Sequence, residues 1–247
     1  MIRLFIIFVL FLNYTFAKDV KVVFSYSTPP FVFTDGSGIV ITIVKEALAH
    51  KGHTVVPTFV NMGRSFEMFE HGYVDATSII KTSSGLKAHY SDYFMQYHNA
   101  GFSLKSKKMN ITKIDDLQGL YVIGFQGSSK FLGEEYGKVV GSLNEKYSEM
   151  ADQKQQVLML LKGRTDLVVM DRHIFKFYKA LLIDEGLVSQ DTEVDMFELF
   201  PPTKYRTAFK DAKIRDDFNE GLKALKNSGR YDEIYDYYEE KFFEIKR

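Results

Sequence analysis

The segment FEHGYVDAT (residues 69–77) recurs in form as LKGRTDLV (residues 161–168). In each copy a helix-like stretch ends at a glycine, two residues follow, and an aspartate precedes residues typical of a β-strand. We interpret the two aspartates, Asp75 and Asp166, as structural loop residues that bind nearby backbone N–H groups. The repeat therefore predicts two α/β lobes of similar design.

Strand-like and helix-like stretches alternate along the rest of the chain, which favours parallel α/β layers. We expect strands at 20–26, 55–60, 73–80, 120–125, 165–170 and 205–209, and helices at 39–49, 63–71, 128–136, 155–161, 211–226 and 231–243. The stretches 102–104 and 205–209 are the predicted crossings between lobes.

The expected fold is α/β and two-lobed, and each lobe is a mainly parallel sheet flanked by helices. Residues 18–102 and 205–247 would form lobe 1, and residues 103–204 would form lobe 2. The length of 247 residues is sufficient for two lobes that each bury a core.

The composition excludes several classes of function. Lys+Arg and Asp+Glu are both 32, and this lack of basic excess argues against nucleic-acid binding. The chain has no Cys, which excludes disulfides, thiolate catalysis and Cys-ligated metals. The six His residues show no metal-binding spacing, and the sequence has no nucleophile elbow, P-loop or dinucleotide fingerprint. We expect no cofactor, no metal site and no enzymatic activity.

The first residues have the pattern of an export signal. Arg3 precedes the apolar run Leu4–Leu12, and Thr15-Phe-Ala17 resembles a leader-peptidase site. The run is much shorter than the roughly 20 apolar residues of a membrane span. We expect residues 1–17 to be a signal peptide cleaved after Ala17, and the mature protein to be a periplasmic monomer. The other interpretation is a buried N-terminal strand or helix.

Several further motifs, taken in order, resemble the bacterial extracellular solute-binding proteins of family 3. They are YSTPPF (26–31), GYVDA (72–76), YSDYF (90–94), DLQGLYVIG (116–124) leading to GSS (127–129), GRTDLVVMD (163–171) and LKALKNSGRYDEIY (222–235). The resemblance covers essentially the whole mature chain. It implies the type II periplasmic binding fold, with two hinge strands between the lobes and a ligand in the cleft. It also implies an amino-acid-like ligand and an ABC permease in the inner membrane as partner.

The resemblance implies roles for one aspartate and two serines. Asp171 follows a strand, where open α/β sheets place ligand contacts, and would accept hydrogen bonds from a ligand ammonium group. Its other interpretation is a cap for the following helix. Ser128 and Ser129, after Gly127, would bind the ligand carboxylate at a helix start. Simple capping is compatible with that role.

The chain departs from the family pattern at the arginine that binds the ligand carboxylate. The expected arginine falls on Ser84 or Gly85. Lys81 or Lys87 could replace it, although lysine lacks the bidentate guanidinium fork. Arg64 is a further candidate, and its other interpretation is a surface arginine in a first helical turn. This departure weakens the case for a standard α-amino acid.

The aromatic residues Tyr26 and Phe31 would form apolar walls of the cleft, or else pack in the core. Ser78 completes the predicted set of ligand-binding residues. The overall prediction is a periplasmic protein that closes its lobes on a small polar solute and delivers it to an importer. Two other functions remain open: a dehydratase-like enzyme on the same scaffold, and a sensor that acts with a membrane receptor.

Overall fold

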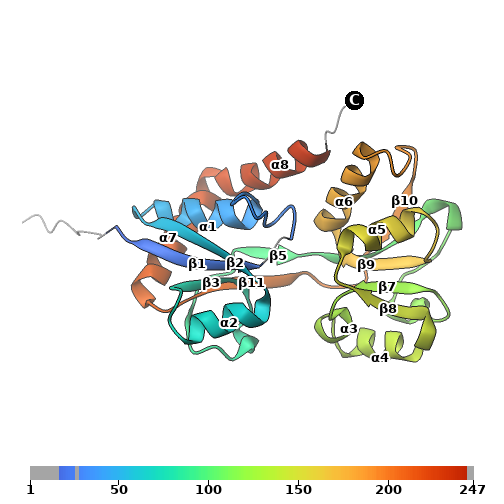
Figure 1. Ribbon diagram of the computed structural model, residues 1–247, viewed down its shortest axis with the longest axis horizontal. Coiled ribbons are helices and arrows are strands. Elements are labelled where there is room, and N and C mark those ends of the chain that lie inside the picture. The colour runs from blue at the N-terminus through green and yellow to red at the C-terminus, as the bar shows by residue number, and fades with distance from the viewer. Residues whose placement is uncertain (1–16, 26–27, 244–247) are drawn as a thin grey trace, which may run out of the picture.

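The computed structural model describes residues 17–25 and 28–243, which form two lobes that stand side by side (Figure 1). The predicted signal peptide, apart from Ala17, lies outside the described residues. Within the part of the chain that is described, no helix is both long enough and apolar enough to cross a membrane.

Lobe 1 is built on a six-stranded sheet with the order β2-β1-β3-β11-β4, in which β5 also pairs with β11. Its strands are β1 (Asp19–Ser25), β2 (Thr54–Val60), β3 (Ala76–Ile80), β4 (His89–Tyr90), β5 (Met95–Tyr97) and β11 (Thr203–Phe209). Its helices are α1 (Ile39–Ala49), α2 (Met62–Glu70), α7 (Ala212–Ser228) and α8 (Arg230–Phe243). The apolar face of α1 is buried in the core, and α7 packs against α1.

Lobe 2 is built on a five-stranded sheet with the order β10-β6-β9-β7-β8. Its strands are β6 (Asn99–Leu104), β7 (Val122–Phe125), β8 (Tyr147–Met150), β9 (Leu167–Asp171) and β10 (Val194–Phe197). Its helices are α3 (Ser128–Phe131), α4 (Glu134–Ser142), α5 (Gln153–Leu161) and α6 (Arg172–Asp184). Short 3-10 helices lie at Thr82–Ser84, Lys105–Lys107, Ile114–Leu117 and Asn144–Lys146.

Both sheets are mixed rather than mainly parallel. In lobe 1, β1 pairs in parallel with β2 and β3, whereas β11 is antiparallel to β3. In lobe 2, β7 pairs in parallel with β8 and β9, whereas β6 is antiparallel to β9 and β10. The strands that run antiparallel to their neighbours are therefore β11 in lobe 1 and β6 in lobe 2. In each of them the chain enters a lobe from the hinge, where it reverses direction relative to the parallel strands.

The lobes are connected by an antiparallel pair of hinge strands. β5 pairs with β11, and Tyr97 lies opposite Thr203 in this pair. The chain enters the sheet of lobe 2 at Asn99, which pairs with Asp171 of β9. The predicted lobe boundary at residue 102 therefore falls inside β6, and the predicted crossing at 102–104 is already part of lobe 2.

The lobes also contact each other on the side of the hinge opposite α2 and α3, where α8 packs against both α1 and α6 (Figure 1). The Phe33 and Phe177 rings meet edge to face there, with centroids 5.7 Å apart. His173 Nδ1 lies 2.9 Å from the carboxylate of Glu239. Burial, followed by the positive charge of Arg172, lowers the pKa of His173 to about 3, so this is a contact with a neutral ring at pH 7.

The repeat that predicted two lobes has the structural role inferred for it. Asp75 accepts a hydrogen bond from the Lys21 N–H at 2.9 Å, and Asp166 accepts one from the Tyr121 N–H at 2.9 Å. In both lobes the aspartate thus holds the backbone of a neighbouring segment of the same lobe. The interpretation of both aspartates as structural residues is confirmed.

One predicted helix is two helices in the structure. The stretch 128–136 breaks at Gly133, which separates α3 from α4 and has a φ of 102°. Glycine adopts this conformation at little cost because it has no Cβ. The break shortens α3 to a single turn beside the cleft.

Candidate functional site

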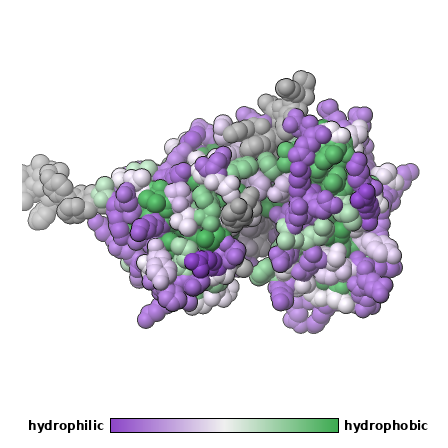
Figure 2. Space-filling model, viewed as in Figure 1, coloured by the Kyte–Doolittle hydropathy of each residue, from purple (hydrophilic) through white to green (hydrophobic). Residues whose placement is uncertain are grey.

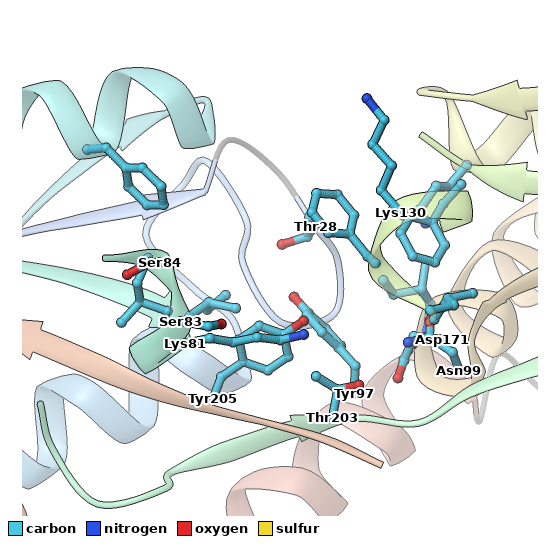
Figure 3. A pocket seen from close by; sticks show the side chains of 18 residues that line it. Thr28, Lys81, Ser83, Ser84, Tyr97, Asn99, Lys130, Asp171, Thr203 and Tyr205 are labelled. Carbon is cyan, nitrogen blue, oxygen red and sulfur yellow. Dashed lines mark hydrogen bonds between the residues drawn. The ribbon is translucent and has the colours of Figure 1, made fainter. Parts of the chain in front are cut away.

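A cleft of about 510 Å³ lies between the lobes and is lined by residues of both lobes and of both hinge strands. Figure 2 shows the molecule hollowed between its two halves, and Figure 3 shows the side chains that line the cleft. Its volume is within the range of roughly 300–1,000 Å³ that is typical of pockets for small ligands.

The lining is mainly aromatic and aliphatic, with few charges. The apolar and aromatic residues are Phe66, Ile79, Ile80, Tyr97, Phe125, Phe131, Leu132, Ile174 and Tyr205. The charged residues are Lys81, Lys130 and Asp171, and the uncharged polar residues are Thr28, Ser83, Ser84, Asn99, Gln153 and Thr203.

Asp171 lines the cleft and also caps α6. It is the last residue of β9 and is 2% exposed. One carboxylate oxygen accepts the N–H groups of His173 at 2.8 Å and Ile174 at 3.2 Å, and the other accepts the His98 N–H at 2.7 Å. Burial raises the pKa of Asp171 to about 7 against the opposing effect of these three bonds. The two roles considered for this residue therefore coexist in one side chain.

Lys81 follows an irregularity in β3. The register of β3 against β11 shifts between Thr77 and Ile80, so β3 carries one extra residue there. Ile79, inside the shift, has a φ of 56°, a left-handed conformation that β-branched residues rarely adopt. Such bulges re-aim neighbouring side chains, and they are enriched beside functional sites. This one immediately precedes the lysine.

The amine of Lys81 lies near the Tyr205 ring, in a part of the cleft where two tyrosines of the hinge strands pack together (Figure 3). It is 5.4 Å from the centre of the Tyr205 ring, and the Tyr97 and Tyr205 rings are 5.3 Å apart. Burial, followed by the charge of Asp171, raises the pKa of Tyr205 to about 12, so its hydroxyl keeps its proton. The amine of Lys130, by contrast, points away from these side chains (Figure 3).

The loop predicted to bind a ligand carboxylate is occupied by a carboxylate of the protein. Glu149 accepts the Gly127 N–H at 2.6 Å, the Ser129 N–H at 2.9 Å and the Ser129 hydroxyl at 2.7 Å. The Tyr147 hydroxyl donates to it at 2.9 Å. Burial alone would raise the pKa of Glu149, but these bonds lower it to about 2. Ser128 is fully buried, and neither serine lines the cleft.

The two predicted aromatic walls have different outcomes. Phe31 is fully buried and packs edge to face against Tyr97, with ring centroids 4.9 Å apart. It supports the lining from behind through Tyr97 and does not line the cleft itself. Tyr26 lies outside the described residues.

Two other predicted residues also lie away from the cleft. Arg64 is exposed in the first turn of α2, with its guanidinium 3.5 Å from Glu67 in the same helix. Ser78 is buried, and its hydroxyl donates to the Val23 carbonyl at 3.3 Å. Of the eight predicted residues, the structure brings Lys81 and Asp171 together in the cleft.

Four of the lining residues that sequence reasoning missed belong to the hinge region. Tyr97, Tyr205 and Thr203 lie on the paired strands β5 and β11, and Asn99 begins β6. Their signal was the predicted crossing itself, because a cleft between two lobes has the hinge strands as its floor. Phe131 was missed because it is the last residue of the short helix α3, whereas the sequence predicted one longer helix over residues 128–136.

Within the described residues, no group of three or more His, Asp or Glu side chains is placed to hold a metal ion. The part of the cleft lining that the structure describes has one acid, two lysines and hydroxyl groups set among rings and aliphatic chains. Such a set can bind a small molecule through a few charge-assisted hydrogen bonds and through extensive apolar contact.

The chain matches a known protein family. The model of the bacterial extracellular solute-binding proteins, family 3, matches residues 20–241. A search of curated proteins finds no match.

Solved structures share the fold at low sequence identity. An ancestral arginine-binding protein bound to arginine has a TM-score of 0.66 and 21% identity, covering 93% of this chain and 99% of that one. An ancestral amino acid-binding protein, a precursor of cyclohexadienyl dehydratase, has a TM-score of 0.66 and 20% identity, covering 91% and 95%. The GluR0 ligand-binding core from Nostoc punctiforme, in complex with L-glutamate, has a TM-score of 0.65 and 19% identity, covering 91% and 99%. These likenesses show the two-lobed type II periplasmic binding fold.

Proposed function

The chain belongs to family 3 of the bacterial extracellular solute-binding proteins, and we propose that it captures a small polar solute, an amino acid or a related metabolite, between its lobes. The observation that carries this proposal is the cleft itself. It has the volume of a small-ligand pocket, and two of its three described charged residues, Lys81 and Asp171, come from opposite lobes.

Closure of the two lobes couples binding to a change of shape. A solute that contacts lobe 1 through Lys81 and lobe 2 through Asp171 binds the closed arrangement more tightly than the open one. It therefore shifts an existing equilibrium toward closure. The paired strands β5 and β11 provide the hinge for this motion.

Asp171 supplies the acceptor for a hydrogen-bond donor of the solute. An ionised carboxylate has about four lone-pair sites. In Asp171, three of these sites already accept backbone N–H groups. The remaining site can accept from an ammonium or hydroxyl group. A buried polar group without a partner is costly, so this site favours a solute that fills it.

The proposed setting is the periplasm, reached through the predicted signal peptide, with the closed form recognised by an ABC permease of the inner membrane. The family to which the chain belongs supports this setting. We propose a monomer with no nucleic-acid partner and no cofactor.

A second candidate function is a dehydratase-like enzyme on the same scaffold. One observation favours it: burial raises the pKa of Asp171 to about 7, and a group that titrates near the working pH is suited to general acid catalysis. A turnover assay with prephenate-like acids separates the two functions. Product formation that Asp171→Asn abolishes would support the enzyme.

Calorimetry tests the principal proposal. The wild-type protein is titrated with a broad panel of amino acids, polyamines and organic acids, and the tightest solute is repeated with Asp171→Ala. We expect saturable binding that weakens at least tenfold in the variant. Absence of binding across the panel, or a variant that binds as the wild type does, would contradict the proposal.

A further inference from the structure

We propose that the solute is a small monocarboxylate with an apolar body, and that its carboxylate binds Lys81 of lobe 1. We also propose that Glu149 closes the neighbouring loop of lobe 2 to anions. This inference rests on the proposed function, because it assigns a chemical class to the ligand of the same cleft. An ammonium group on the solute is not required.

The first step is the loop Gly127–Ser129, beside the cleft residues Phe125 and Lys130. Its backbone N–H groups and hydroxyls are of the kind that would suit an incoming carboxylate. They are already committed to Glu149, with bonds of 2.6 to 2.9 Å from Gly127 and Ser129. A second carboxylate would compete with Glu149 for the donors of Gly127 and Ser129 and would be repelled by its charge. The anionic group of a solute must therefore bind elsewhere.

The second step is the choice among the cations of the cleft. Among the described residues of the lining, Lys81 and Lys130 are the basic ones and none is an arginine. The Lys130 amine points away from the labelled side chains, whereas the Lys81 amine lies among them near Tyr205 (Figure 3). Within the described part of the chain, Lys81 has no carboxylate within ion-pair distance. This half-buried cation is thus available to an anion from outside.

The third step is the number of charges. One inward-facing amine balances one negative charge, and a second anionic group would enter a mainly aromatic and aliphatic cleft without a partner. Burying an unpaired charge in such surroundings is strongly unfavourable. The rings of Phe66, Phe125 and Phe131 and the side chains of Ile79 and Ile174 instead suit an apolar body. A monocarboxylate meets both conditions.

The fourth step concerns an ammonium group. Asp171 is the acidic residue of the described lining, and both of its oxygens already accept backbone N–H groups. A hydroxyl or an ammonium can use the remaining lone pair. The site therefore accepts an amine, but it does not surround one with several free acceptors, and the anion at Lys81 is expected to contribute more to binding.

Two sets of matched compounds test this class. The first set is 3-phenylpropanoate, L-phenylalanine and 2-phenylethylamine, and the second is 4-methylpentanoate, L-leucine and 3-methylbutylamine. Within a set the body is the same, while the carboxylate alone, both groups or the amine alone is present. Calorimetry at pH 7 should show binding of the acid about tenfold weaker than that of the amino acid, because the contact with Asp171 is lost, and binding of the amine at least tenfold weaker than that of the acid.

Three lysine variants assign the anion contact. Lys81→Met should weaken binding of the acid at least tenfold, and Lys81→Arg, which keeps the charge, should restore most of it. Lys87→Met is the matched control, because Lys87 is exposed in the same segment and does not line the cleft. Thermal melting confirms that each variant is folded. Recovery by Lys81→Arg separates a lost charge from a lost fold.

The outcomes distinguish this inference from the proposed function. Amines that bind as well as the acids, acids that fail where the amino acids bind, or equal binding by Lys81→Met would overturn the inference. No binding by any of the six compounds would also overturn it. In each of these cases the proposed function stands if a solute of the broad panel binds in a manner that depends on Asp171.

Discussion

Ser129 donates two hydrogen bonds to the same carboxylate oxygen of Glu149, one from its backbone N–H at 2.9 Å and one from its hydroxyl at 2.7 Å. The two residues come from different elements, since Ser129 lies in α3 and Glu149 lies in β8. The pair ties the turn after β7 to the edge strand of lobe 2. It also explains why the donors of Gly127 and Ser129, in a loop with the composition of an anion site, are already used within the protein.

Replacing Glu149 tests this pair. We expect Glu149→Gln to lower the free energy of unfolding by about 1–3 kcal/mol, because charge-assisted bonds are lost and partly buried donors lose an acceptor. Urea denaturation provides the measurement. Glu145→Gln is the control, since Glu145 is exposed, and it should change the free energy by less than about 0.5 kcal/mol.

Glu149 also predicts how the free energy of unfolding depends on pH. The pKa of Glu149 is lowered from 4.5 to about 2, so its contribution is complete above pH 4.5 and disappears as the pH falls toward 2. The difference in stability between wild type and Glu149→Gln should shrink over this range. Equal stability of the two proteins at pH 7 would contradict the role assigned to Glu149.

For Asp171 we expect the opposite dependence of stability on pH. Because its pKa is raised from 3.8 to about 7, the folded protein keeps a proton that the unfolded chain has lost between these values. The stability of the unliganded protein should therefore fall as the pH rises from about 4 to 7 and then level off. Asp171→Asn, whose carbonyl can still cap α6, should show a flatter profile. Urea denaturation at several pH values would contradict the assignment if both profiles had the same slope.

Two adjacent isoleucines test the bulge before Lys81. Ile79 has a φ of 56°, and relief of this conformation by Ile79→Gly should recover about 1–2 kcal/mol, which offsets the lost side-chain contacts. Ile80 is 3% exposed, and Ile80→Gly should cost about 3 kcal/mol or more. Denaturation curves should place the two variants at least about 2 kcal/mol apart. Equal destabilisation would mean that the bulge is not strained.

A pair of helical glycines tests the packing of lobe 1. A Cβ on Gly221 of α7 would lie 1.9 Å from the Ala47 carbonyl oxygen of α1, so Gly221→Ala should destabilise by about 1–3 kcal/mol. Gly141 of α4 has nothing within 4 Å of such a Cβ, and Gly141→Ala should stabilise by about 0.5–1 kcal/mol. Thermal melting measures both. A stabilising Gly221→Ala would contradict the close approach of the two helices.

Much of the fold was predictable because its signals are local. The glycine and aspartate of each repeat mark a helix end and a strand start, and Asp75 and Asp166 have the predicted structural role. Asp171 could be placed in the cleft because the end of a β-strand faces the ligand in open α/β sheets.

Other features depend on strand pairings that the sequence does not reveal. Glu149 reaches the loop after β7 only because β7 and β8 pair with Gly124 opposite Glu149. The short strand YSEM (147–150) has no clear apolar pattern, and it was not predicted. Arg64 was considered as the missing cation on its position in a helix, but its side chain contacts Glu67 outside the cleft.

Small-angle X-ray scattering during a titration with the tightest solute tests the central claim, closure of two lobes on a bound small molecule, most directly. The account predicts that the radius of gyration falls in proportion to the bound fraction measured by calorimetry. It also predicts that, at the same solute concentration, Asp171→Ala shows neither the binding measured by calorimetry nor the decrease in radius of gyration. A radius of gyration that stays constant at saturation would contradict the account.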